Sequence, residues 1–381
     1  MSTPISISIL SADAIRRALA VRDLTDPAQG PHAMQALCEA AMAALRTAWG
    51  SEVIVERASP IVSIADNYDR LHYPPGAAAR DARYTRYVCE SALLRAHTTA
   101  MIPPLLRRLA QEPAVARDVL LVCPGLAYRR DSIDRLHTGE PHQLDLWRIC
   151  TRRSLGTGDL RAMIERLVEV LVPGRAVRTL AARHPYTTDG LQIDVRAHDG
   201  EWVEIGECGL ALPALLAESG LAVPSSSGLA MGLGLDRILM LRKGLSDIRL
   251  LRSTDPRVAA QMLDLLPYRE VSAMPAVRRD LSLAVDVDAT PEDLGDCVRA
   301  ALGREADVVE SIELLSQTAY DALPEAARAR LGIAPGQKNL LVRVTLRALE
   351  RTLTHEQCNA LRDRIYAALH RGTAWQWASG G

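Results

Sequence analysis

A glycine-rich run that leads directly into an Asp-Arg pair constrains the fold of this chain more than any other part of its sequence. The run reads GLAMGLGLDRILMLRKGLSDIR, residues 228–249. Gly228, Gly232 and Gly234 let a flat ligand approach the strand backbone closely, because glycine has no Cβ. Arg237, just ahead of an apolar helical run, can place its fixed charge across a phosphate. The pattern also fits an ordinary strand-helix junction in which Arg237 forms a salt bridge.

Length, composition and charge limit the class of protein. The chain has 381 residues, which favours two or three domains, and 48% hydrophobic with 24% charged residues is typical of a globular protein with a sizeable core. The net charge of -1 gives no overall attraction to nucleic acid. A nucleic-acid partner would therefore have to be held by a local patch.

The cysteines and the apolar runs indicate the compartment. The seven cysteines include no CxxC pair, which predicts free thiols rather than a zinc site or a disulfide framework. The N-terminal sequence has no basic start followed by an apolar core, and no apolar run approaches the roughly 20 residues that a membrane-spanning helix needs. We therefore expect a soluble, cytoplasmic protein with no membrane partner.

Strand patterns dominate residues 120–237, with little β-α-β alternation. Two alternating stretches flank His198-Asp199-Gly200, which predicts a hairpin with a DG turn. Further patterns predict one strand across 51–64 and helices at 31–49, 91–111 and 157–172. Together they predict an α+β fold in which an antiparallel sheet is flanked by helices.

A second domain is predicted from residue 268 onward. Its elements are expected in the order strand, helix, strand, strand, helix, strand, at 280–288, 290–303, 306–317, 339–350, 354–372 and 375–378. Thr290 and Thr354 are expected to cap the two helices. This βαββαβ order predicts a ferredoxin-like domain.

Three further stretches can be compared with a known family: YRRDSIDRLHTGEPHQLDLWRI (128–149), SIADNYDRLHYPPGAAARD followed by LLRAHTTAM (63–101), and WVEIGECG (202–209). The last two resemble DNFD…P…HPARD…LLRTHTS and WLEVLGCG of phenylalanyl-tRNA synthetases. From about Ser63 to its end, the chain resembles the single-chain, organellar layout of that family. The resemblance implies an N-terminal extension at 1–30, a class II synthetase-like catalytic domain at 31–265 and an anticodon-binding-type ferredoxin-like domain at 268–381.

The resemblance also implies an activity, with ATP and Mg²⁺ as cofactors and an amino acid and tRNA as partners. The amino acid would be activated to an aminoacyl-adenylate and transferred to tRNA, without a protein nucleophile. The residues implied for catalysis and for ATP are Arg129, Asp131, His137, Glu204 (also the metal ligand), Gly232, Gly234 and Arg237. Those implied for the amino acid are His97, Thr99, Gln143 and Asp145, with His184, Tyr186 and Ala230 around its side chain. Those implied for tRNA are Arg279, Arg343, Arg347 and Arg351.

The chain departs from the family in the side-chain pocket. The family has Phe-Pro-Phe where this chain has His184-Pro185-Tyr186, and buried polar groups penalise a purely apolar substrate. This predicts a side chain other than plain phenylalanine, such as a polar or hydroxylated aromatic one. Ala230, which sets the pocket depth in the family, is retained, and its presence predicts a pocket that is still deep.

Two other functions fit the sequence as well. The chain could adenylate an amino acid for a non-tRNA acceptor in a biosynthetic pathway, or it could be a catalytically silent protein that binds tRNA or an amino acid. Affinity for tRNA and its dependence on salt would separate transfer to tRNA from transfer to a non-tRNA acceptor. The family resemblance allows either a monomer or a homodimer.

Overall fold

The computed structural model describes residues 9–82, 84–112, 117–130, 132, 134–222, 226–271 and 274–374. The chain divides into two compact units. The first unit comprises Met1–Arg129, Glu140–Leu251 and Pro256–Arg269. The second unit comprises Arg130–Gly139, Arg252–Asp255 and Glu270–Gly381.

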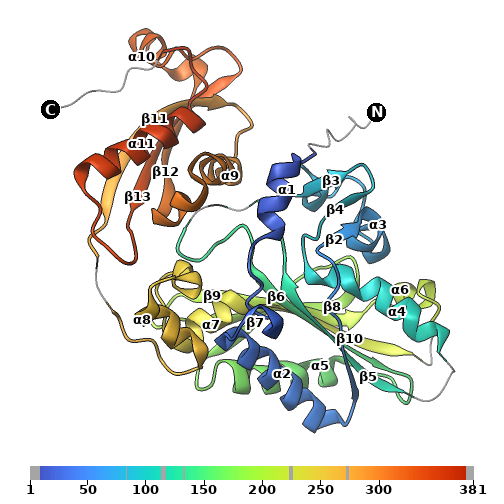
Figure 1. The fold of residues 1–381 in the computed structure, drawn as a ribbon. Helices are drawn as coiled ribbons and strands as arrows, with labels where there is room; N and C mark the ends of the chain where they lie inside the picture. The colour runs from blue at the N-terminus through green and yellow to red at the C-terminus, as the bar shows by residue number, and fades with distance from the viewer. Residues whose placement is uncertain are drawn as a thin grey trace. The chain divides into compact units, whose positions relative to one another are not determined.

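A seven-stranded sheet forms the centre of the first unit (Figure 1). In spatial order its strands are β1 (Glu52–Val55), β5 (Asp118–Leu126), β6 (His142–Cys150), β10 (Ser227–Gly234), β9 (Trp202–Ala211), β8 (Thr187–Arg196) and β7 (Val177–Ala181). All neighbours are antiparallel except β1 and β5, which are parallel. The sheet is therefore mixed rather than antiparallel throughout, because the long connection from β1 to β5 lets the chain re-enter in the same direction.

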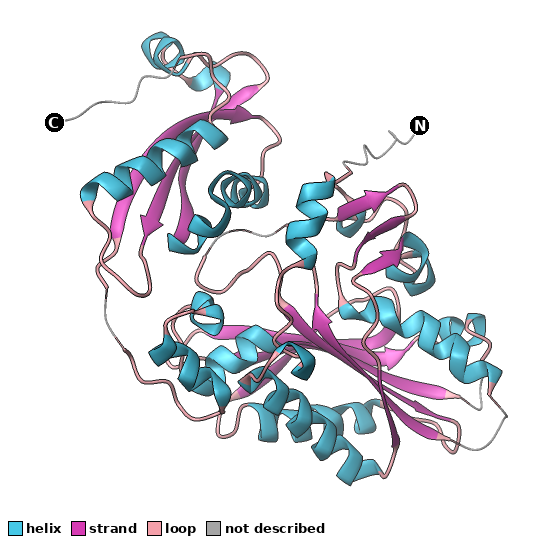
Figure 2. Ribbon diagram, viewed as in Figure 1, coloured by secondary structure: helices cyan, strands magenta, loops and turns pink. Residues whose placement is uncertain are grey.

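Helices and a second, small sheet surround the large sheet (Figure 2). The small sheet has the order β2 (Ile61–Ser63), β4 (Ala92–Leu94) and β3 (Arg86–Cys89). The helices of this unit are α1 (Ala12–Leu19), α2 (Ala33–Trp49), α3 (Ile64–Asn67), α4 (Ile102–Gln111), α5 (Thr157–Leu171), α6 (Pro213–Glu218), α7 (Leu235–Lys243) and α8 (Pro256–Ala259). Leucines of α4 and α6 pack against one face of the large sheet in a cluster that includes Trp147 and Ala230.

Two predictions of elements in the first unit were wrong. The single strand expected across 51–64 is two strands, β1 and β2, which belong to different sheets. The helix expected across 91–111 begins only at Ile102, after β4 and the 3-10 helix η4 (Thr98–Met101). Pro103 and Pro104 explain the late start, because proline fits the first turn of a helix but not its interior.

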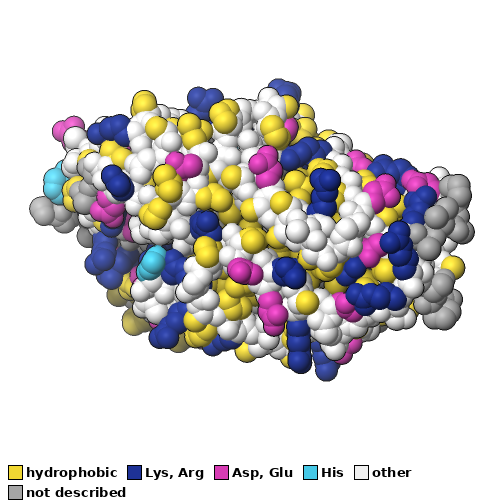
Figure 3. All heavy atoms as spheres, turned by 90° about the horizontal axis from the view of Figure 1, so that it is seen from below, with side chains coloured by type: hydrophobic (Ala, Val, Ile, Leu, Met, Phe, Trp, Pro, Cys, Tyr) yellow, Lys and Arg dark blue, Asp and Glu magenta, His cyan; other side chains and the backbone are white. Residues whose placement is uncertain are grey.

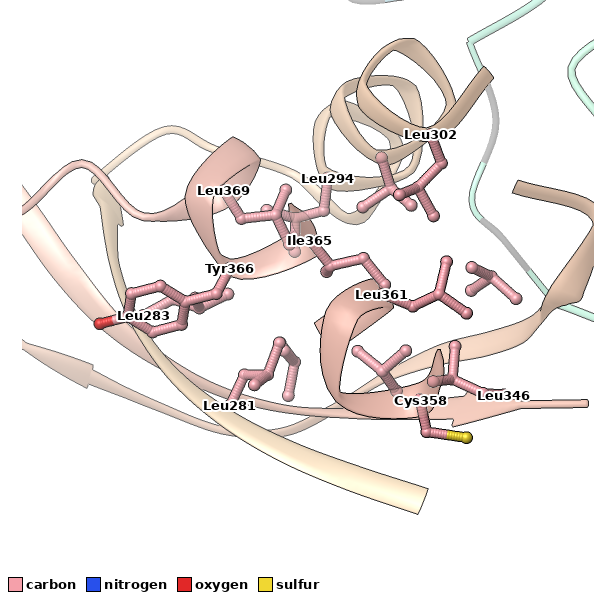
Figure 4. Packing of buried hydrophobic residues seen from close by; sticks show 14 of the residues in the cluster. Leu281, Leu283, Leu294, Leu302, Leu346, Cys358, Leu361, Ile365, Tyr366 and Leu369 are labelled. Carbon is pink, nitrogen blue, oxygen red and sulfur yellow. The ribbon is translucent and has the colours of Figure 1, made fainter. Parts of the chain in front are cut away.

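The second unit contains a three-stranded sheet in the order β11 (Val277–Asp286), β13 (Gln337–Leu346) and β12 (Val309–Ala319). α9 (Pro291–Leu302) and α11 (His355–Leu369) belong to one hydrophobic cluster with the sheet, and Figure 4 shows leucines of both helices and of β11 within this cluster. α10 (Glu325–Leu331), between β12 and β13, was not predicted from the sequence. The closing strand expected at 375–378 lies outside the described residues.

The distribution of charged side chains on the surface and the apolar character of the helices both agree with the composition. On the face drawn in Figure 3, Lys and Arg side chains are interspersed with Asp and Glu, as the net charge of -1 leads one to expect. In the described part of the chain, no helix combines the length and the apolar character needed to cross a membrane.

The capping box that begins α9 yields the first prediction. The Thr290 hydroxyl accepts a hydrogen bond from the Asp293 backbone N–H at 3.3 Å, and Asp293 Oδ2 accepts one from the Thr290 backbone N–H at 3.0 Å. Thr290→Ala removes the first of these bonds, so we expect the free energy of unfolding to fall by about 1 kcal/mol in urea denaturation followed by circular dichroism. Ser316→Ala, at an exposed position of β12, is the control, and equal unfolding curves for both variants would contradict the prediction.

Candidate active site

Three neighbouring strands bring predicted site residues onto one face of the large sheet. In the register of β6, β10 and β9, Asp145 lies opposite Gly232, and Gly232 lies opposite Glu207. Gly232 has no side chain, so this row holds two carboxylates with a gap between them. A Cβ built on Gly232 would meet Asp145 Oδ2 first, at 3.7 Å. A ligand can therefore reach the Gly232 backbone between the two carboxylates.

The same face continues on either side of this row. Gln143 pairs with Gly234, and Trp147 pairs with Ala230. Trp147 and Ala230 are 0% and 2% exposed, and the Tyr186 ring stacks on Trp147 with 6.0 Å between centroids. The indole of Trp147 and the ring of Tyr186 thus pack in the same cluster as Ala230, and the pocket depth expected from Ala230 stays a prediction.

Asp145 is held by three hydrogen-bond donors. Its Oδ2 accepts from the hydroxyls of Thr98 and Thr99 at 2.8 and 3.0 Å, and its Oδ1 accepts from Trp147 Nε1 at 3.3 Å. Burial raises the pKa of Asp145 to about 6, although these bonds act in the opposite direction. Gln143 is tied to the same segment, since its Oε1 accepts from the Thr98 backbone N–H at 3.2 Å. A carboxylate offers about four acceptor positions, so Asp145 keeps roughly one for a ligand.

His97 lies immediately before η4 and faces two tyrosine rings. It stacks on Tyr73 with 5.7 Å between centroids and meets the edge of Tyr68 at 6.2 Å. Both ring nitrogens are buried and have no hydrogen-bond partner among the residues that the structure describes. Burial, helped by the nearby charge of Arg129, lowers the pKa of His97 to about 3, so the ring is neutral. Buried polar atoms without partners are rare, which makes His97 a candidate for contact with a ligand.

Two arginines come from elements on different sides of the site. Arg129 follows β5, and its Nε donates to the Ala96 carbonyl at 2.7 Å. Arg237 lies in the first turn of α7, and its Nη1 donates to the Glu204 carbonyl at 3.2 Å. The charge of Arg129 helps to lower the pKa of Glu207, so the arginine and this carboxylate belong to one electrostatic environment.

Two glutamates of β9 lie close together. The β8 register on β9 skips Ile205, and this bulge interrupts the strict alternation between Glu204 and Glu207. Glu207 Oε2 lies 2.7 Å from His184 Nε2, and this contact lowers the pKa of Glu207. The pKa of Glu204 is raised by burial first and by the charge of Glu207 second. A cation near Glu204 would relieve this repulsion.

Two predicted ATP-binding residues are not placed at this face. Asp131 lies outside the described residues. His137 belongs to the second unit, where its Nδ1 lies 2.7 Å from Asp134 Oδ2. The roles expected for both residues stay predictions.

The arginines predicted to bind tRNA do not lie on one sheet face. β13 ends at Leu346, so Arg347 and Arg351 lie beyond the strand. Arg279 lies directly opposite the core residue Val344, so its side chain is on the core face of the sheet. Arg343 lies between core residues along β13, so its side chain is on the other face. Their side-chain partners are Asn359 for Arg279, Asp280 for Arg343, Glu310 for Arg347 and Gln357 for Arg351.

The sequence analysis missed Glu207, Trp147 and Thr98. A signal existed for Glu207, because WVEIGECG has Glu at the position where the compared WLEVLGCG has Gly. Trp147 lies within a continuous strand pattern that predicted only burial. Thr98 lies beside Thr99 in LLRAHTTAM, and only the folded chain shows that both hydroxyls reach Asp145.

The fold and this polar face place the chain among α+β proteins with a ligand-accessible mixed sheet and a ferredoxin-like second unit. Residues 32–262 match the family model of the tRNA synthetases class II core domain (F), and residues 272–376 match that of the ferredoxin-fold anticodon binding domain. The first match spans more than half of the chain. The chain therefore belongs to the class II tRNA synthetase core family.

Curated relatives carry the names of phenylalanine–tRNA ligases. The chain is 34% identical over 195 residues to an alpha subunit from Prochlorococcus marinus, which covers 51% of this chain and 56% of that protein. It is 31% identical over 207 residues to an alpha subunit from Streptococcus pyogenes, covering 51% and 58%. It is 28% identical over 326 residues to the chloroplastic/mitochondrial ligase of Arabidopsis thaliana, covering 81% and 69%. The chain thus spans a little over half the length of the alpha subunits that it matches.

The raised pKa of Asp145 predicts a pH-dependent stability. The folded-state pKa of about 6 lies above the ordinary value of 3.8, so the folded chain binds this proton more tightly than the unfolded chain. Going from about pH 3 to pH 7, we expect the wild type to lose stability relative to Asp145→Asn, by up to about 3 kcal/mol. The measurement is the free energy of unfolding of both proteins across this range. The exposed Asp288→Asn is the control, and a difference between Asp145→Asn and the wild type that does not vary with pH would contradict the prediction.

Proposed function

We propose that this chain is an ATP-dependent ligase that activates an amino acid to an aminoacyl-adenylate and transfers the aminoacyl group to tRNA. The observation that carries the proposal is the joint position of Asp145, Gly232 and Glu207 in one row, with neutral His97 and the charge of Arg129 beside it. These groups are chemically suited to anchor an ammonium group, a carboxylate and a phosphate. We propose a polar aromatic side chain for the amino acid, because His184 and Tyr186 bring polar atoms to its pocket.

The residues would act by positioning and by charge. Asp145, ionised above about pH 6, and Gln143 would bind the ammonium group, while Arg129 would bind the amino acid carboxylate and the α-phosphate. Arg129 and Arg237 would stabilise the charge that develops at phosphorus when the carboxylate attacks. His97 would contact the amino acid as a neutral hydrogen-bonding group. Nothing in this scheme requires a nucleophile from the protein.

The site fits ATP together with Mg²⁺. Glu204 is a carboxylate whose pKa is raised by burial and by neighbouring negative charge, and a hard cation would stabilise its ionised form. Within the described residues no three His, Cys, Asp or Glu side chains are grouped to hold a metal. Mg²⁺ commonly takes one or two carboxylates and completes its shell with substrate phosphates and water. Bound there, the ion would neutralise phosphate charge.

Transfer to tRNA is favoured over the other two functions by two observations. A ferredoxin-fold anticodon binding domain follows the core, which a ligase for a non-tRNA acceptor does not need. Arg129 and Arg237 are both retained, which a silent binding protein does not need. Either a monomer or a homodimer is compatible with this proposal.

Removal of the α7 arginine tests the proposed activation step. We expect Arg237→Ala to lower amino-acid-dependent ATP–pyrophosphate exchange by roughly 100-fold or more, because it removes a fixed charge next to the reacting phosphate. The exchange should be measured over a panel of the standard amino acids and aromatic analogues. The control is Arg161→Ala on the exposed side of α5. Exchange that is unchanged in Arg237→Ala would exclude the proposed role, and a wild type without exchange for any amino acid would support the silent binding protein.

Salt dependence of RNA binding tests the proposed acceptor. We expect total tRNA to bind with an affinity that falls as salt rises from about 50 to 200 mM, because phosphate contacts release counterions. Arg351 donates a hydrogen bond to the neutral Gln357 side chain, so Arg351→Ala leaves no unpaired charge. This variant should weaken binding and reduce the slope of log affinity against log salt by about 1. Filter binding measures both quantities, with the exposed Arg330→Ala on α10 as the control. Absence of tRNA binding would favour a non-tRNA acceptor.

A further inference from the structure

Glu207 has more unused capacity for binding than Asp145, the carboxylate at the other end of the row. Its side chain is 42% exposed, whereas Asp145 is 3% exposed. Oε2 contacts His184, and Oε1 accepts no hydrogen bond within the described part of the chain. Glu207 thus uses about one of four acceptor positions, whereas Asp145 uses three.

The location of Glu207 assigns it to the side chain of the amino acid rather than to its ammonium group. Asp145 and Glu207 lie two strands apart, about 10 Å across the sheet, with Gly232 between them. The Asp145 side of the row carries Gln143, which with Asp145 binds the ammonium group in the proposed function, and the threonines that hold Asp145. On the other side, Glu207 contacts His184, whose ring lies 5.7 Å from that of Tyr186. In the proposed function Asp145 takes the ammonium group and Arg129 takes the carboxylate, which leaves the side chain as the part of the amino acid that can pair with Glu207.

The surroundings of Glu207 favour a donor on that side chain. The His184 side chain is 10% exposed and already occupied by Glu207, so it cannot satisfy Oε1 as well. Glu204 lies near enough for the charge of Glu207 to act on it, which adds negative charge to this end of the site. An apolar ring placed here would desolvate a carboxylate without pairing it, whereas a hydroxyl or amino group would hydrogen-bond to it.

We propose that Glu207, held in place by His184, determines specificity, and that the preferred amino acid carries a hydrogen-bond donor, a hydroxyl or amino group, on its side chain. This inference rests on the proposed function, since it takes the row of Asp145, Gly232 and Glu207 to be the amino acid site. It names the chemistry of the substrate, which the family alone does not provide.

The test compares donor and non-donor amino acids of similar shape. The probes are L-tyrosine and 4-amino-L-phenylalanine as donors and L-phenylalanine as the matched non-donor, each used in ATP–pyrophosphate exchange with wild type, Glu207→Gln and Glu201→Gln. Glu201 is exposed in the turn that precedes β9, so its variant carries the same substitution outside the site. We expect Glu207→Gln to lower kcat/KM for the donors by about 10- to 100-fold, mainly through KM, and to leave the value for L-phenylalanine within about threefold.

A double replacement keeps the test informative if Glu207→Gln disturbs folding. His184→Phe with Glu207→Gly removes both polar partners together, and we expect it to shift preference toward L-phenylalanine. A wild type that prefers L-phenylalanine, with the same preference in Glu207→Gln, would overturn the inference and leave the proposed activation intact. If no amino acid supports exchange, the proposed function fails, and calorimetric titration with the same amino acids decides the inference. Donor binding that Glu207→Gln abolishes would uphold it, whereas binding without discrimination, or no binding, would overturn it.

Discussion

A buried histidine–aspartate pair joins the segments on which the site is built. His142 begins β6 and Asp236 lies in the first turn of α7, and both are nearly inaccessible to solvent. Asp236 accepts from the His142 backbone N–H at 2.5 Å and from its Nδ1 at 2.9 Å, while His142 Nε2 accepts from the Leu24 backbone N–H at 3.0 Å. The Leu24 bond places the ring proton on Nδ1, and no ring nitrogen is left unpaired. Because Gln143 follows His142 and Arg237 follows Asp236, this one pair sets two positions of the site and ties the N-terminal segment to them.

The two residues of the Asp-Arg pair behind the glycine-rich strand therefore have different roles. Asp236 points into the protein and fixes the junction of strand and helix, which leaves Arg237 directed along the end of β9 toward Glu204. Glycine stands at positions in this strand and its neighbour for a separate reason. At Gly232 the missing side chain leaves a gap between two carboxylates, whereas a Cβ at Gly206 would collide with the Gly232 carbonyl oxygen. The same residue type thus provides access at one position and close strand packing at the other.

The sequence predicted much of this architecture because its signals are local. The capping threonines Thr290 and Thr354 and the strand and helix periods of the second unit depend on residues within a few positions of one another, and the structure has both caps. The pairing of β1 with β5 and the division of 51–64 between two sheets depend on partners far away in the chain, which no local pattern contains. The site shows the same limit. Motifs pointed to Asp145, Gly232 and His97, but the three hydrogen bonds that Asp145 accepts from Thr98, Thr99 and Trp147 follow from strand register and packing.

His184 and Glu207 depend on each other for a physical reason. Replacing His184 alone by an apolar residue would leave Glu207 without its hydrogen-bond partner, next to the negative charge of Glu204. Replacing Glu207 alone would leave a His184 side chain that is 10% exposed with one polar atom unpaired, at a cost of about 1–3 kcal/mol. The two departures from the family pattern are therefore best understood as one change, which exchanges an apolar wall for a hydrogen-bonded polar pair. In the proposed amino acid site, such a pair would separate substrates by what they can donate to Glu207 more than by how well their rings pack.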